Sequence, residues 1–108
     1  MTIIDVWINC PSNDVAREIS EVLVSERLAA CTNTFAGIQS AFHWKGGVER
    51  EAEVPLLVKT REDLFDAVCR RVEELHPYET PGIMALEIKH VNRDYLEWVV
   101  EETVDGGG

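Results

Sequence analysis

The chain has 108 residues, which suits a single domain with one modest hydrophobic core. It carries 20 acidic against 10 basic residues, and the resulting net charge of −10 opposes binding to nucleic acid or to an anionic membrane surface. No apolar run approaches the roughly 20 residues of a membrane span, and "MTIIDVWINC" has no basic flank typical of a signal peptide. We therefore expect a cytoplasmic protein without nucleic-acid or membrane partners.

Apolar alternation predicts a first strand over Ile3–Cys10. One face of this strand is uniformly apolar, and the other is mixed and includes Trp7. Pro11 ends the strand, and polar N-cap candidates follow it, so we expect a helix that fades near Arg27 or Leu28.

Two further strands joined by a hairpin are predicted between residues 29 and 60. The first is interrupted near Ala36–Gly37, and "KGG" at 45–47 provides the turn. Pro55 cannot donate to a neighbouring strand, so we expect an edge or a bulge there. Acidic residues alternate along the returning strand and predict a solvated acidic face, formed by Glu49, Glu51 and Glu53.

The spacing of Thr60 and Asp63 predicts a capping box at the start of a second helix. This helix should end at Leu75, because Pro77 disfavours the helical conformation at the residue before it. A strand over 82–91 and a last helix capped by Asn92 follow.

The predicted order is β-α-β-β-α-β plus a C-terminal helix, which is the α+β, ferredoxin-like split βαβ sandwich. We expect one domain over residues 1–104 and a flexible tail, "DGGG", over 105–108. Two helices can cover only one face of the sheet. The second face, with Trp7, and the long hairpin therefore favour oligomerisation.

Five separate motifs occur in order along the chain: "SERLAACTN", "W-x-G" at 44–46, "LLVKT" at 56–60, "HPYETP" at 76–81 and "YLEW" at 95–98. Together they resemble the CutA divalent-cation tolerance family over essentially the whole chain. The resemblance implies a ferredoxin-like homotrimer that binds a divalent cation such as copper, or a small ligand, and requires no other cofactor. It also implies the alternative of a PII-like signalling or scaffold trimer, which senses an organic ligand in clefts between subunits.

The resemblance attaches a metal site to Cys10 and to a histidine pair, of which His76 is the second member and Leu75 replaces the first. Thiol and imidazole groups suit Cu and Zn, and Glu79 is the nearest further ligand in sequence. Each residue also has a structural explanation. Cys10 continues an apolar stripe, and "HPYETP" can serve only as a stiff connector between helix and strand.

For a ligand cleft, the resemblance implies the polar residues Lys59, Tyr78 and Glu79, with Trp44 and Trp98 as walls. Lys59 follows a buried apolar run and needs a partner, which is either an anionic ligand or a carboxylate such as Glu79. No nucleophile elbow, zinc-protease motif or phosphate loop is present in the sequence. We therefore expect a binding protein and not an enzyme.

Overall fold

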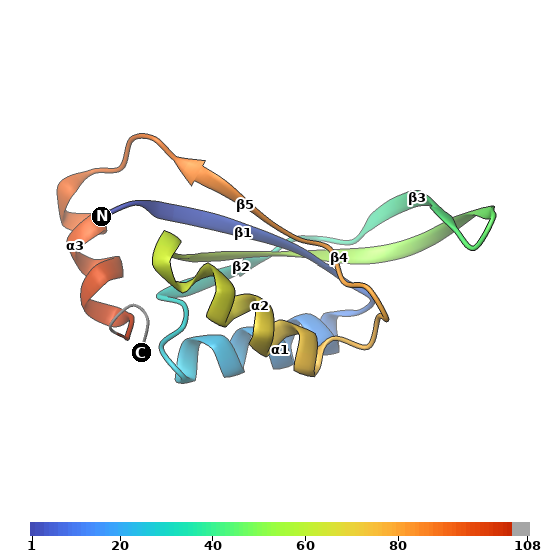
Figure 1. The fold of residues 1–108 in the computed structure, drawn as a ribbon, viewed down its shortest axis with the longest axis horizontal. Coiled ribbons are helices and arrows are strands. Elements are labelled where there is room, and N and C mark those ends of the chain that lie inside the picture. Colours follow the sequence, from blue (N-terminus) through green and yellow to red (C-terminus); the bar gives the residue numbers. More distant parts are fainter. Residues whose placement is uncertain (105–108) are drawn as a thin grey trace.

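The computed structural model describes residues 1–104, and the predicted tail at 105–108 lies outside the described residues. The elements are β1 (Ile3–Cys10), α1 (Asn13–Ser25), β2 (Cys31–Thr34), β3 (Ile38–Trp44), β4 (Gly47–Arg61), a 3-10 turn (Glu62–Leu64), α2 (Phe65–Leu75), β5 (Ile83–Ile88) and α3 (Arg93–Glu102) (Figure 1). None of these helices is long and apolar enough to cross a membrane.

The strands form one antiparallel sheet in the order β2-β4-β1-β5, and β3 pairs with β4 beyond its end. Helices α1 and α2 lie side by side under one face of the sheet (Figure 1). This arrangement confirms the predicted ferredoxin-like fold with an additional C-terminal helix. The hairpin of β3 and β4 projects past the sheet, and the molecule is 45 Å along its longest axis.

The main core lies between the sheet and the two helices. Alternate residues of β1 and β4 point toward α1 and α2 and are almost fully buried with them, as the period-two pattern of β1 predicted. The largest of these side chains are Val6, Ile8, Ile19, Leu23, Leu56, Val58, Val68 and Val72. A second, smaller cluster joins Ile3, Ala30 and Val99, so α3 covers the end of the opposite face.

Helix α1 begins as predicted, because the hydroxyl of Ser12 accepts a hydrogen bond from the amide of Val15 at 3.2 Å. It ends at Ser25, slightly earlier than expected, and Arg27 then takes a positive φ of 59°. Helix α2 ends at Leu75 as predicted, and His76 is extended. Asn92 precedes α3 as predicted, without a side-chain capping hydrogen bond.

The predicted capping box at Thr60 is wrong. Thr60 still belongs to β4, where it pairs with Ile4, and its hydroxyl donates to the carbonyl of Leu28 at 2.7 Å. Asp63 instead pairs with Arg61 at 3.0 Å, and a 3-10 turn without a side-chain cap leads into α2. Strand pairing with β1 therefore extends through the residue that local spacing assigned to a helix cap.

Pro55 does not lie at an edge, because β4 is flanked by β1 on one side and by β2 and β3 on the other. The irregularity is in the partner strand. Strand β2 pairs with β4 from Lys59 to Leu56, and β3 pairs with β4 from Glu53 back to Gly47. The missing amide of Pro55 faces this gap, while its carbonyl accepts from the amide of Phe35 at 2.9 Å. The interruption predicted near Ala36–Gly37 is confirmed.

The hairpin turn at Lys45 and Gly46 is also confirmed. Both residues have positive φ, at 49° and 84°, which matches the twist of a two-residue hairpin turn. Glycine takes this conformation without steric cost, whereas Lys45 accepts mild strain.

Substitution of Leu56 by Ala should lower the free energy of unfolding by about 2–5 kcal/mol, because it leaves a cavity in the main core. The matched control is Val24→Ala on the outer face of α1, where the side chain is partly exposed and the change should stay within about 0.5 kcal/mol. Chemical denaturation at one fixed protein concentration measures both values. Equal effects of the two substitutions would contradict the assignment of this core.

Candidate functional site

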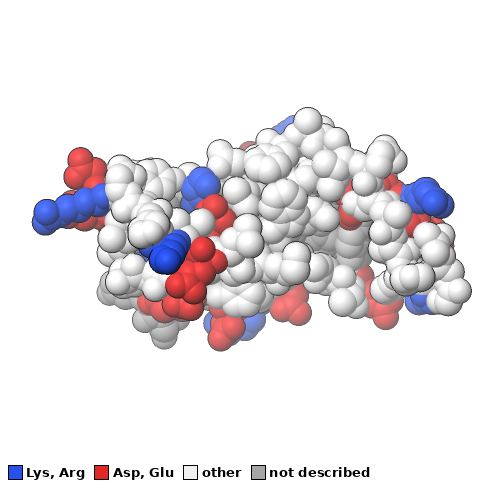
Figure 2. Space-filling view, turned by 90° about the horizontal axis from the view of Figure 1, so that it is seen from above, with Lys and Arg blue, Asp and Glu red and all other residues white. Residues whose placement is uncertain are grey.

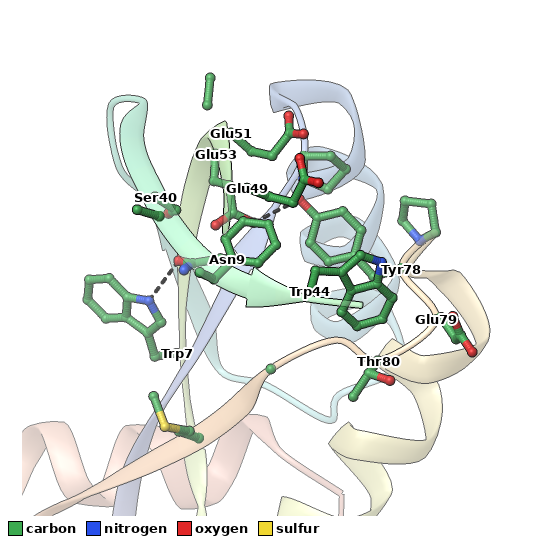
Figure 3. Close-up of a pocket in the computed structure, with 17 residues that line it drawn as sticks. Trp7, Asn9, Ser40, Trp44, Glu49, Glu51, Glu53, Tyr78, Glu79 and Thr80 are labelled. Carbon is green, nitrogen blue, oxygen red and sulfur yellow. Dashed lines mark hydrogen bonds between the residues drawn. The ribbon is translucent and has the colours of Figure 1, made fainter. Parts of the chain in front are cut away.

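A groove of about 940 Å³ lies between the open face of the sheet, the β3–β4 hairpin and the connector from α2 to β5 (Figure 3). Trp44, Tyr78 and Glu79 of the predicted site residues line it. The other walls include aromatic and acidic side chains, which are Trp7, Phe42, Glu49, Glu51 and Glu53.

The connector that contains "HPYETP" is fixed by its own imidazole. His76 is only 6% exposed, and its Nε2 lies 2.8 Å from the carbonyl oxygen of Asn9. Its Nδ1 accepts from the amide of Tyr78 at 3.2 Å. These two contacts define a neutral ring, since Nε2 must carry the proton that it donates to the carbonyl. Both ring nitrogens are therefore already engaged within the chain. These contacts fix the conformation of the connector between α2 and β5.

The phenol of Tyr78 ties the connector to the root of the hairpin. Its hydroxyl donates to Oε2 of Glu53 at 2.8 Å (Figure 3). Burial, and next the hydrogen bond to the Glu53 carboxylate, raise the pKa of Tyr78 well above its ordinary value. Glu53 is only 5% exposed, so the prediction of a solvated face is wrong for this residue. Glu49 and Glu51 are exposed as expected.

Cys10 ends β1 inside the main core and is fully buried. Burial, and next the negative charge of Glu53, raise the pKa of this thiol to about 11, so the sulfur is protonated at neutral pH. No group of three or more His, Cys, Asp or Glu side chains within residues 1–104 is arranged to hold a metal ion. Cys10, His76 and Glu79 are thus not a ready three-ligand set in one chain, and metal binding by them stays a prediction.

Lys59 forms an ion pair, but its partner differs from the one suggested. Its Nζ lies 3.3 Å from Oδ1 of Asp5, which is directly opposite on β1. Glu79 instead lies 4.0 Å from Lys45 at the hairpin turn.

Trp98 lies on α3, and its ring centroid is 5.5 Å from that of Tyr95. The hydroxyl of Tyr95 contacts Sγ of Cys31, which pairs with Lys59 in the sheet. The predicted cleft residues therefore fall into two groups on one chain. Trp44 and Tyr78 line the groove, whereas Lys59 and Trp98 belong to the region near α3.

Most residues of the groove escaped prediction as site residues, among them Trp7, Asn9 and Glu53. The alternation along β1 did place Trp7 on the open face, where its indole N–H donates to Oδ1 of Asn9 at 2.8 Å. The alternation along β4 likewise predicted that Glu53 lies on the same face of the strand as Glu49 and Glu51. Neither pattern showed that the connector would fold over these side chains.

The stability of the fold should fall as the pH rises above 9. The pKa of Cys10 is raised from 9.0 to about 11 in the folded chain, so the folded state holds the proton that the unfolded state releases in this window. The contribution of Cys10 is complete below pH 9, and its loss by pH 11 amounts to about 2–3 kcal/mol.

Denaturation at several values between about pH 8 and pH 9.5 tests this expectation, because the tyrosines ordinarily ionise only near 10.0. Cys10→Ala should flatten the decline. The matched control is Cys69→Ala, which removes a half-buried thiol and should flatten the decline less. A parent decline unchanged by Cys10→Ala would show that this thiol does not cause it.

Comparison with known proteins gives a consistent result. The family model of the CutA1 divalent ion tolerance protein matches residues 4–102. The divalent-cation tolerance protein CutA of Thermus thermophilus is 48% identical over 98 residues, which cover 91% of this chain and 95% of that protein. The chloroplastic protein CutA 1 of Oryza sativa is 40% identical over 98 residues, which cover 91% of this chain but 55% of the rice protein.

Solved structures agree in fold. The crystal structure of CutA1 from Oryza sativa has a TM-score of 0.94 and 38% identity, covering 98% of this chain and 97% of that one. The periplasmic CutA of Archaeoglobus fulgidus has a TM-score of 0.90 and 36% identity, covering 93% and 97%. Since these relatives include a chloroplastic and a periplasmic protein, the cytoplasmic location of this chain stays a prediction. The extent of the match and the shared fold show that the chain belongs to the CutA1 divalent ion tolerance protein family.

Proposed function

We propose that this chain acts in divalent-cation tolerance as a homotrimer, with a binding site where the groove of one subunit meets the next subunit. The observation that carries the proposal is the separation of the predicted cleft residues. Trp44 and Tyr78 line the groove, whereas Trp98 is on α3 and Lys59 is on the part of β4 that lies near α3. Assembly of several copies is the arrangement that can bring both groups to one cleft.

The open face of the sheet supports assembly. Met84 and Leu86 on β5 are 68% and 58% exposed, and Trp44 on the hairpin is exposed as well. Figure 2 looks onto this side, where uncharged surface occupies the centre and charged side chains gather toward the ends. Large apolar groups gathered on one face are typical of a protein-protein interface. Strand β5 also has a free edge, because among residues 1–104 it pairs only with β1.

The metal site that we propose uses Cys10, His76 and Glu79, completed by a ligand from a neighbouring copy. Glu79 is exposed and available. His76 can ligate only if it gives up its contact with Asn9 or with the amide of Tyr78, and Cys10 must first lose its proton. Thiolate and imidazole favour copper or zinc among divalent cations. Metal binding at this site should therefore be weak, because the loss of a His76 contact and the deprotonation of Cys10 both cost free energy.

Two other functions are less well supported. The family is named for divalent-ion tolerance, which favours a cation over the organic ligand of the alternative PII-like sensor. The family name also denotes no reaction, and we propose a binding role and not catalysis.

The trimer should appear as three times the monomer mass in light scattering at micromolar protein concentration. Met84→Asp combined with Leu86→Asp should convert it to monomer, because the charges would be buried in the interface. Val24→Asp on the outer face of α1 is the matched control and should leave the mass unchanged. A parent protein that is monomeric at this concentration would overturn the proposed assembly.

Titration with Cu(II) or Zn(II) tests the metal site. Binding to the parent should saturate, and Cys10→Ala, His76→Ala and Glu79→Gln should each weaken it about tenfold or more, because each removes one ligand. Glu101→Gln on α3 removes an equal charge outside the site and serves as control. If the three site variants bind like the parent, these residues are not the ligands.

A further inference from the structure

We infer that Arg27 is a positioning residue, which fastens the end of α3 to the turn after α1 and so sets the place of Trp98. Helix α3 covers one end of the open face of the sheet, and its C-terminal end lies beside this turn (Figure 1). The role rests on the proposed function, because Trp98 is one of the residues assigned to the cleft between subunits. The contacts that Arg27 makes all lie within one chain, so they do not depend on which surfaces the assembly buries.

Arg27 stands where a helix-ending turn favours glycine. Its φ is 59°, in the left-handed region, and it follows α1, whose last residue is Ser25. The amide of Arg27 donates to the carbonyl of Val24 at 3.1 Å. The amide of Leu28 donates to the carbonyl of Leu23 at 2.9 Å and closes the turn. Residues other than glycine adopt this helix terminus at a steric cost, which the contacts of the Arg27 side chain offset.

The guanidinium of Arg27 binds the C-terminal end of α3. Its Nη1 donates to Oε2 of Glu102 at 3.2 Å and to the carbonyl oxygen of the same residue at 3.4 Å. Glu102 is the last residue of α3, and the last turn contains no basic residue but the two carboxylates of Glu101 and Glu102. The C-terminal end of a helix carries partial negative charge and carbonyls without donors, so a cation stabilises it. Arg27 supplies from another element the positive charge that α3 lacks there.

The backbone of Arg27 makes a further contact with the same end of α3. Its carbonyl accepts a hydrogen bond from the amide of Val104 at 2.9 Å. The hydroxyl of Thr103 serves the carbonyls of Val99 and Val100 from within the same terminus, at 2.9 Å and 3.2 Å. Glycine at position 27 would keep the backbone contact and lose the guanidinium, so this substitution isolates the role of the side chain.

Helix α3 has only a small buried surface, which gives its attachments their weight. Val99 is the buried residue of the helix and packs in the smaller core cluster. Near the start of α3 the hydroxyl of Tyr95 lies 3.4 Å from Sγ of Cys31. Trp98 lies between this contact and the Arg27 contact along the helix, and its side chain is 39% exposed. A helix with so few buried groups takes its tilt and rotation from its two attached ends, and Trp98 moves with them.

The same contacts add little to the stability of the whole fold. The side chains of Arg27 and Glu102 are 58% and 41% exposed, and an exposed ion pair is screened by water and salt. Arg27→Gly relieves the steric cost while it loses the ion pair, so the midpoint of chemical denaturation should stay close to that of the parent. The effect should be confined to α3, which separates a positioning role from a general structural one.

Two measurements on the full chain test the inference. Fluorine NMR of protein labelled with 5-fluorotryptophan gives signals for Trp7, Trp44 and Trp98, which single Trp→Phe substitutions assign. Arg27→Gly should shift or broaden the Trp98 signal and leave the other two unchanged. Hydrogen exchange of the amides in the last turn of α3 should become about threefold or more faster, because that end of the helix opens more often.

Further variants isolate the charge of the guanidinium. Arg27→Lys keeps the positive charge and should restore at least about half of the protection that Arg27→Gly loses. Glu102→Gln removes the carboxylate but leaves the contact with the carbonyl, and its effect should be smaller than that of Arg27→Gly. Arg93→Ala is the matched control, because it removes an ion pair with Glu97 at 3.2 Å that lies wholly within α3. The control should leave the Trp98 signal and the last turn unchanged.

Parent-like exchange of α3 together with an unshifted Trp98 signal in Arg27→Gly would overturn the inference. Equal shifts of all three tryptophan signals would also overturn it, since they would report a change of the whole fold. An effect of Arg27→Lys as large as that of Arg27→Gly would show that the positive charge is not the cause. A monomeric parent protein would overturn the proposed assembly instead, and the exchange of α3 would then still decide the role of Arg27.

Discussion

The structure depends on β4 being one continuous strand of 15 residues with two different environments. Its second half lies between β1 and β2 and buries Leu56 and Val58 against the helices. Its first half leaves the core and, within the part of the chain that the structure describes, pairs only with β3. Because side chains alternate along a strand, one register sets both the core residues and the acidic row that faces the groove. A shift by one residue would exchange the two faces, so core packing also fixes the chemistry of the site.

The one-sided cover of the sheet follows from the same layout. Helices α1 and α2 bury one face, and α3 reaches only the end of the other. The connector at 76–82 then turns toward the free face, held by the contacts of His76 with Asn9 and of Tyr78 with Glu53. The prolines of "HPYETP" set where the helix stops and the strand resumes, while the polar side chains between them fix the position of the connector. The segment is therefore both a corner and a wall of the groove.

Much of the fold was predictable because it rests on local rules. The alternation in β1, the glycine turn of the hairpin and the proline stop after α2 are properties of short segments. The errors arose where distant segments meet. Thr60 has the spacing of a helix cap, but its pairing with β1 decides its conformation. The partner of Lys59 and the burial of Glu53 likewise follow from strand register and from the fold of the connector. The predicted site residues came from motifs shared with the CutA family and from their chemical type, both of which the sequence shows directly.

Chemical type does not show whether a ligand atom is free. Both nitrogens of His76 are engaged by backbone groups, and the thiol of Cys10 is protonated within the core. The soft ligands of the chain thus stabilise the fold, and a soft metal reaches them only when these contacts are exchanged. The carboxylates beside them are different, since Oε1 of Glu53 accepts no hydrogen bond from the described residues, and Glu49 and Glu51 are exposed. The chain has a net charge of −10, and the accessible polar atoms of the groove include carboxylate oxygens. The groove therefore favours a positively charged group over a soft metal that would need the Cys10 thiol or the His76 imidazole.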